Sequence, residues 1–78
     1  SMMKNLYEKG RLVLSFEVFP PKTEAGFNAM YRAIGKLAAF QPGFISVTYG
    51  AGGSTRQQSL EIVTRIRQEF NIPATAHF

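Results

Sequence analysis

Hydrophobic residues fall along this chain in two kinds of pattern, which predict strands alternating with helices. Near-continuous apolar runs cover residues 12–19 and 44–49, and such runs are typical of strands covered on both faces of a parallel sheet. A third strand is expected to begin at residues 74–78. Between the strands, apolar residues recur at helical spacing and predict two amphipathic helices. Residues 2–10 predict a further short helix that ends at Gly10.

The ends of the two internal helices carry recognisable signals. Thr23 is the predicted N-cap of the first helix, and Ser54 with Gln57 fits a capping box at the start of the second. Breaks are expected at residues 41–43 and 71–73, which contain prolines. The expected buried stripes are Phe27, Met30, Tyr31, Ile34, Leu37 and Ala38 in the first helix, and Leu60, Val63, Ile66 and Phe70 in the second. The arginines expected mostly on the solvated face are Arg56, Arg65 and Arg67.

This order of elements predicts an α/β fold with a parallel sheet and helical crossovers. The strands start about 30 residues apart, which fits a (β/α)8 TIM barrel and also a doubly wound sheet. The last strand has no helix to cover it. We therefore expect residues 1–78 to be the first two and a half βα units of one longer domain, a fragment with no complete domain. Ser1, ahead of two methionines, is interpreted as a tag remnant.

Composition narrows the possible functions. The chain has no cysteine, which excludes disulfides, a thiolate nucleophile and a cysteine-based metal site. The net charge of +4 comes from scattered basic residues, so it gives little support for a nucleic-acid partner. No apolar stretch approaches the roughly 20 residues that span a bilayer, so no membrane association is expected. A cytoplasmic location is the expectation.

Glu17 is the strongest single candidate for chemistry. Strand alternation places Val13, Ser15, Glu17 and Phe19 on one face, and a uniformly apolar set on the other. Glu17 would then face the interior near the carboxyl end of the strand, where barrel enzymes place catalytic groups. Partial desolvation there favours the protonated form needed by a general acid. We favour this role over an edge-strand or ion-paired structural glutamate, because burying an unneeded charge is costly.

Two further strand ends carry polar residues. Alternation places Ser46 and Thr48 on the inner face of the second strand, with Thr48 near Glu17. His77 lies at the corresponding level of the third strand, although a hydrogen-bonded structural histidine is an equally good interpretation. A lone histidine makes a poor metal site, so no metal is predicted. Together, Glu17, Thr48 and His77 form a candidate constellation.

A glycine-rich loop at residues 50–55 joins the second strand to the second helix. Backbone amides at a helix start can cradle a phosphate or allow a flat cofactor to approach closely. A tight turn that simply needs glycine is about as good an interpretation. Arg56 is the basic residue placed to meet an anion there.

Three blocks of this sequence resemble the methylenetetrahydrofolate reductase family in order and spacing. They are residues 15–23 (SFEVFPPKT), 46–56 (SVTYGAGGSTR) and 76–78 (AHF). The resemblance implies a (β/α)8 barrel that uses NADH or NADPH to reduce FAD and then reduces 5,10-methylenetetrahydrofolate to 5-methyltetrahydrofolate. That reaction belongs to one-carbon metabolism and methionine biosynthesis.

The resemblance also implies roles for individual residues. Glu17 matches the general acid that protonates the folate nitrogen whose departure opens the five-membered ring. Thr48, Tyr49 and Ala51 match positions that line the FAD, Thr48 also lying near the nicotinamide, and His77 matches a further flavin contact. The complete protein is expected to bind a folate and to form a homo-oligomer.

Two alternatives from other classes stay open on the sequence. One is a small α/β module that binds a phosphate-bearing ligand through the glycine loop. The other is a non-catalytic fragment that assembles through its exposed strand edges. Because the later strands of a barrel are missing from these residues, the 78-residue piece alone is predicted to have no reductase activity.

Overall fold

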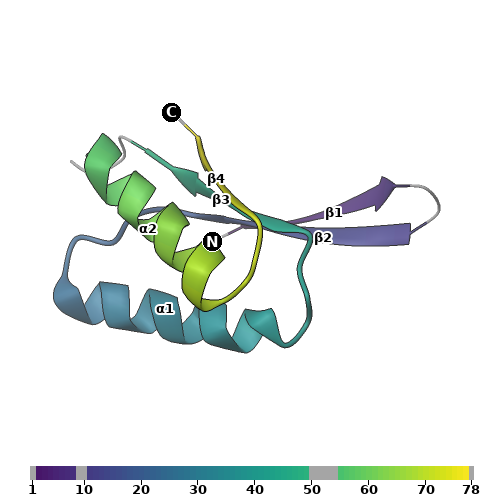
Figure 1. Ribbon diagram of the computed structural model, residues 1–78, viewed down its shortest axis with the longest axis horizontal. Helices are drawn as coiled ribbons and strands as arrows, with labels where there is room; N and C mark the ends of the chain where they lie inside the picture. The colour runs from purple at the N-terminus through teal and green to yellow at the C-terminus, as the bar shows by residue number, and fades with distance from the viewer. Residues whose placement is uncertain (1, 9–10, 50–54, 78) are drawn as a thin grey trace.

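The protein is a small α/β structure in which one sheet carries two helices. A computed structural model describes residues 2–8, 11–49 and 55–77. Its elements are β1 (Met2–Glu8), β2 (Arg11–Val18), α1 (Glu24–Ala38), β3 (Phe44–Thr48), α2 (Arg56–Glu69) and β4 (Ala74–His77) (Figure 1). The sheet order is β1-β2-β3-β4. β2, β3 and β4 are parallel, as the sequence predicts.

The short helix predicted at residues 2–10 is wrong, because residues 2–8 form a strand. β1 pairs antiparallel with β2 along its whole length, from Met2 opposite Glu17 to Glu8 opposite Arg11. An isolated helix this short is marginal in water, whereas pairing satisfies the backbone groups along an otherwise open edge of β2. β1 and the first half of β2 extend beyond the helices (Figure 1). Gly10, the predicted helix stop, lies outside the described residues.

Both helix starts are capped by a threonine. The Thr23 hydroxyl accepts a hydrogen bond from the Gly26 amide at 3.0 Å, which confirms the predicted N-cap of α1. The capping box of α2 lies one residue later than predicted. Thr55 Oγ1 accepts from the Gln58 amide at 3.0 Å, and Gln58 Oε1 accepts from the Thr55 amide at 3.3 Å. Gln57 instead bonds Glu61, and Ser54 lies outside the described residues.

The buried face of α2 is rotated slightly from the predicted one. Val63 and Ile66 are buried and Phe70 is half-buried, as expected, but Leu60 is 42% exposed. Ser59 and Ile62 are buried in its place. Ser59 is small enough to fit beneath the helix, and its hydroxyl bonds the Thr55 carbonyl at 3.4 Å. Within the described residues, neither helix is long and apolar enough to be a membrane span.

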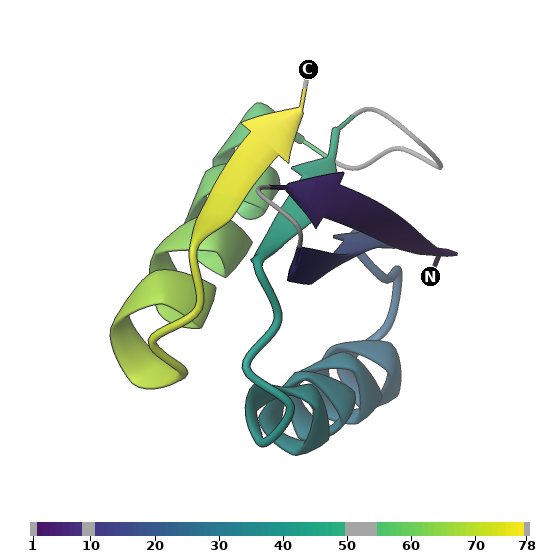
Figure 2. The ribbon, with the colours of Figure 1, turned by 90° about the vertical axis from the view of Figure 1, so that its right-hand side faces the viewer.

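Among the residues whose burial is described, the hydrophobic core lies on one face of the sheet. Both helices cover that face (Figures 1 and 2), and one cluster joins their side chains to the strands. Its fully buried members include Ile34 from α1, Ile62 and Ile66 from α2, and Ile45 and Val47 from β3. A doubly wound sheet would reverse its strand order and carry helices on both faces. The three described parallel strands show neither feature, an arrangement shared by a barrel and by one half of a doubly wound sheet.

Candidate functional site

On the face of the sheet opposite the helices, the described side chains toward the carboxyl ends of β2, β3 and β4 are polar. Ile45 and Val47 point into the core, so strand alternation puts Ser46 and Thr48 on the other face. Phe16 and Val18 likewise pack against the core, which leaves Glu17 beside Ser46, its partner across the β2–β3 pair. The predicted face assignments are therefore confirmed for residues 16–18 and 45–48.

Glu17 and Thr48 meet on this polar face. Thr48 Oγ1 donates a hydrogen bond to Glu17 Oε2 at 3.1 Å, in a part-buried position. Since Glu17 pairs with Ser46, Thr48 reaches it diagonally from two residues further along β3. The predicted proximity of these two residues, which are 31 apart in the sequence, is confirmed.

His77 lies on the same face as Glu17, but in the next row of side chains toward the carboxyl ends of the strands. It is the partner of Thr48 across the β3–β4 pair, whereas Ser46 pairs with Thr75. The polar positions therefore form two rows, Glu17–Ser46–Thr75 and Thr48–His77. The expectation that Glu17 and His77 lie level with each other is wrong by one row, because the β2–β3 register pairs Glu17 with Ser46 and not with Thr48. Thr75 was not among the predicted site residues, although strand alternation in β4 places it on this face.

The remaining predicted site residues follow β3. Tyr49 is 39% exposed, and its amide donates to the His77 carbonyl at 3.0 Å, which continues the β3–β4 pairing past the strand. Ala51 and most of the glycine loop lie outside the described residues. At the start of α2, the capping box occupies the amides of Thr55 and Gln58, two donors that a phosphate at this helix start would otherwise use.

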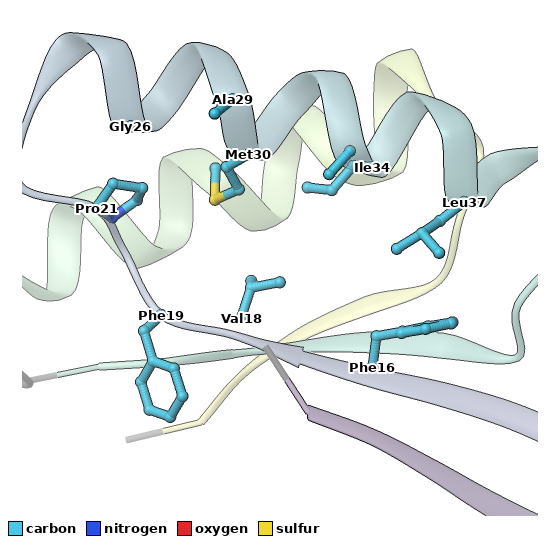
Figure 3. A pocket seen from close by; sticks show the side chains of 10 residues that line it. Phe16, Val18, Phe19, Pro21, Gly26, Ala29, Met30, Ile34 and Leu37 are labelled. Atoms are coloured by element: carbon cyan, nitrogen blue, oxygen red, sulfur yellow. The ribbon is translucent and has the colours of Figure 1, made fainter.

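The helix side of the sheet holds an apolar groove of about 330 Å³ between α1 and the end of β2. Figure 3 shows Phe16 and Val18 rising from β2 toward α1, while Phe19 points away from the helix. Other lining residues are Pro21, Gly26, Ala29, Met30, Ala33, Ile34 and Leu37. None of these side chains carries a group for acid, base or nucleophilic chemistry, so the groove belongs to the packing and the candidate site stays on the polar face.

Arg65, which was predicted to lie on the solvated helix face, also contacts a side chain of α1. Its guanidinium lies 3.9 Å from the centroid of the Tyr31 ring and pairs with Glu69. Tyr31 also stacks on Phe70, with ring centroids 6.4 Å apart. Burial raises the pKa of the Tyr31 hydroxyl above its ordinary value, although Arg65 partly opposes the shift. The cluster ties α1 to α2 on the side of the sheet remote from Glu17.

The chain is similar to known reductases along nearly its whole length. The profile of the methylenetetrahydrofolate reductase family matches residues 2–78. A relative named methylenetetrahydrofolate reductase (NADH) 1, from Arabidopsis thaliana, is 37% identical over 75 residues, which are 96% of this chain and 13% of the relative. A probable methylenetetrahydrofolate reductase (NADH) from Oryza sativa is 41% identical over 68 residues, 87% of this chain and 11% of the relative.

A bacterial relative gives the same result. The 5,10-methylenetetrahydrofolate reductase of Escherichia coli is 33% identical over 69 residues, 88% of this chain and 23% of the relative. The chain thus spans less than a quarter of the length of these curated relatives. The family profile covers every element from β1 to β4. This chain belongs to the methylenetetrahydrofolate reductase family.

Proposed function

We propose that these residues form the first βα units of a (β/α)8 barrel that reduces 5,10-methylenetetrahydrofolate to 5-methyltetrahydrofolate. Family membership supports the reaction. Family membership also favours the barrel, and the one-sided helical cover and the consecutive order of β2, β3 and β4 are compatible with it. In such a barrel the polar face that carries Glu17 would be the interior face, and the carboxyl ends of the strands would form the rim of the active site.

The observation that carries this proposal is the Glu17–Thr48 pair. A carboxyl group near the carboxyl end of a parallel strand, part-buried and within hydrogen-bond distance of a neighbouring hydroxyl, is a group that can act as a general acid. Glu17 holds a proton on a carboxyl oxygen and gives it to the folate nitrogen that leaves as the five-membered ring opens. The carboxylate that results stays beside the hydroxyl of Thr48, which stabilises its charge.

The same strand ends fit a flavin. The exposed ring of Tyr49 offers a flat surface at the end of β3, and the exposed imidazole of His77 offers a polar group for the heteroatoms of an isoalloxazine ring. Thr48 and Ala51 complete the set of residues proposed to line FAD. When bound, FAD supplies the hydride that it takes from NADH or NADPH. The names of the two plant relatives specify NADH, so NADH is the first reductant to test.

Replacing Glu17 by Gln in the complete flavin-loaded protein tests the acid role. Glutamine keeps the size of the side chain but has no proton to give. We expect the rate constant for reoxidation of the reduced flavin by 5,10-methylenetetrahydrofolate to fall by about 100-fold or more. Reduction of the flavin by NADH should persist, and stopped-flow absorbance measures both steps separately.

Glu24→Gln is the matched control, because Glu24 is exposed in the first turn of α1. This control should leave both steps close to those of the parent protein. An unchanged folate step in the Glu17→Gln protein would overturn the role proposed for Glu17.

A further inference from the structure

The hydroxyl of Thr48 is held within hydrogen-bond distance of the carboxyl group of Glu17. The neighbouring residues Ile45 and Val47 are both fully buried, at 0% exposure, so β3 is anchored on its core side. Thr48 projects from this anchored strand and donates to Glu17 Oε2 at 3.1 Å. Threonine is β-branched and has few side-chain rotamers, so the direction of the donated bond is well defined.

This hydrogen bond makes the two oxygens of Glu17 unequal. Oε2 accepts from Thr48, so Oε1 is the oxygen left to carry a proton. The bond is compatible with both protonation states, because Oε2 remains an acceptor whether or not Oε1 is protonated. It becomes stronger when the group is ionised, since hydrogen bonds to charged acceptors are roughly twice as strong as neutral ones.

We propose that Thr48 is a positioning residue for proton transfer, acting through Glu17. It fixes Oε2, so that the transferable proton lies on Oε1. As the proton passes to the leaving folate nitrogen, the electron pair of the O–H bond stays on the carboxylate, and Thr48 stabilises the charge that develops. This inference rests on the proposed function, because it needs Glu17 as the acid. It adds a role for Thr48 that is separate from contact with a cofactor.

Thr48→Val and Thr48→Ser separate the hydroxyl from the rest of the side chain. Valine keeps the branched shape without a donor, and serine keeps the donor without the methyl group. In the complete flavin-loaded protein, we expect Thr48→Val to slow the single-turnover folate step by about five- to tenfold, the difference between a neutral and a charge-assisted hydrogen bond. Thr48→Ser should recover most of the rate that Thr48→Val loses, because it keeps the donor. Rate constants are taken per bound flavin.

The decisive comparison repeats Thr48→Val in the Glu17→Gln protein. If Thr48 acts through Glu17, its effect on the folate step disappears in that background, because no proton is delivered there. Thr64→Val is the matched control, since the exposed Thr64 hydroxyl bonds only the Leu60 carbonyl of its own helix among the described contacts, at 2.8 Å. If Thr48→Val does not bind flavin, Thr48→Ser and Thr48→Ala make the same comparison, because they differ only in the hydroxyl.

Three results would overturn the inference. They are a parent-like rate in Thr48→Val, an equal loss in the valine and serine variants, and an undiminished valine effect in the Glu17→Gln background. Each leaves the proposed function standing if Glu17→Gln alone abolishes the folate step. A parent-like folate step in Glu17→Gln would instead remove the acid role proposed for Glu17, and the inference with it, while leaving the reductase function in place.

Discussion

At the scale of single residues, Tyr31 shows how one side chain can join two helices. Its ring stacks on Phe70 and lies under the guanidinium of Arg65. A cation over an aromatic face is favourable, and Glu69 holds the guanidinium by an ion pair within the same helix. Half-burial of Tyr31 raises the pKa of its hydroxyl above 10.0, since desolvation outweighs the opposing effect of Arg65.

The raised pKa predicts a loss of stability in alkali. Above pH 10.0, the ordinary pKa of tyrosine, the unfolded chain loses this proton before the folded one. The free energy of unfolding therefore falls as the pH rises from that value through the higher pKa of the folded state. We expect Tyr31→Phe to flatten this alkaline decline, as measured by urea unfolding at a series of pH values. Parallel declines in the two proteins would contradict the prediction.

Single-residue chemistry was only partly accessible from the sequence. Strand alternation was enough to place Glu17, Ser46 and Thr48 on one face, because the side-chain period of a strand is two. It could not fix the offset between strands, so it placed His77 level with Glu17. It also could not show that Arg65 would meet Tyr31, because that contact depends on how two helices pack on the sheet.

At the scale of elements, Gly26 and Gly35 of α1 differ in how much space surrounds them. A Cβ added at Gly26 would lie 2.8 Å from Pro21 Cβ and 3.2 Å from the capping oxygen Thr23 Oγ1. A Cβ added at Gly35 would lie 3.5 Å from Phe70 Cε1, an ordinary contact. Pro21 packs so closely on the first turn of α1 that position 26 requires glycine. Position 35 has room for a larger side chain.

Alanine substitutions at these positions should have opposite effects on stability. Gly35→Ala should raise the free energy of unfolding by up to about 1 kcal/mol, because alanine is the better helix former. Gly26→Ala should lower it despite the same intrinsic gain, since Pro21 and the N-cap must shift. Chemical denaturation of the two variants beside the parent measures both. Equal stabilisation by the two substitutions would contradict this prediction, because it would show that Pro21 can shift without lowering the free energy of unfolding.

The element boundaries illustrate where sequence signals are strong. The Thr23 cap and the breaks near residues 41 and 71 were predicted correctly, and Gln41 and Asn71 have positive φ angles of 50° and 54°. Positive φ ends a helix sharply. The capping box of α2 was displaced by one residue, because Ser54 and Thr55 are both good N-caps followed three residues later by glutamine.

At the scale of the whole molecule, the two faces of the sheet are unlike. One face is closed by α1 and α2 over a single core, and the other carries the polar rows that include Glu17 and Thr48. In the proposed barrel, the groups that complete such a site come from the ends of several further strands. The three described parallel strands supply only some of these groups.

The isolated 78-residue chain should therefore show no turnover. A verified chain of this length, supplied with FAD, NADH and 5,10-methylenetetrahydrofolate, is expected to form no 5-methyltetrahydrofolate above the uncatalysed background. The complete protein, assayed under the same conditions by product chromatography, is the positive control. Measurable turnover by the 78-residue chain would refute the prediction.

Sequence patterns alone were enough to predict the order of the internal elements, the apolar and polar faces of the parallel strands, and the family that the motif blocks indicate. These features are local, since they depend on periodicity and on residues close together in the chain. Tertiary contacts set the structure of residues 2–8, the buried stripe of α2 and the register of β2 against β3. Each of these depends on a partner distant in the sequence, because a backbone edge, a core or a neighbouring strand must be present before one arrangement is preferred.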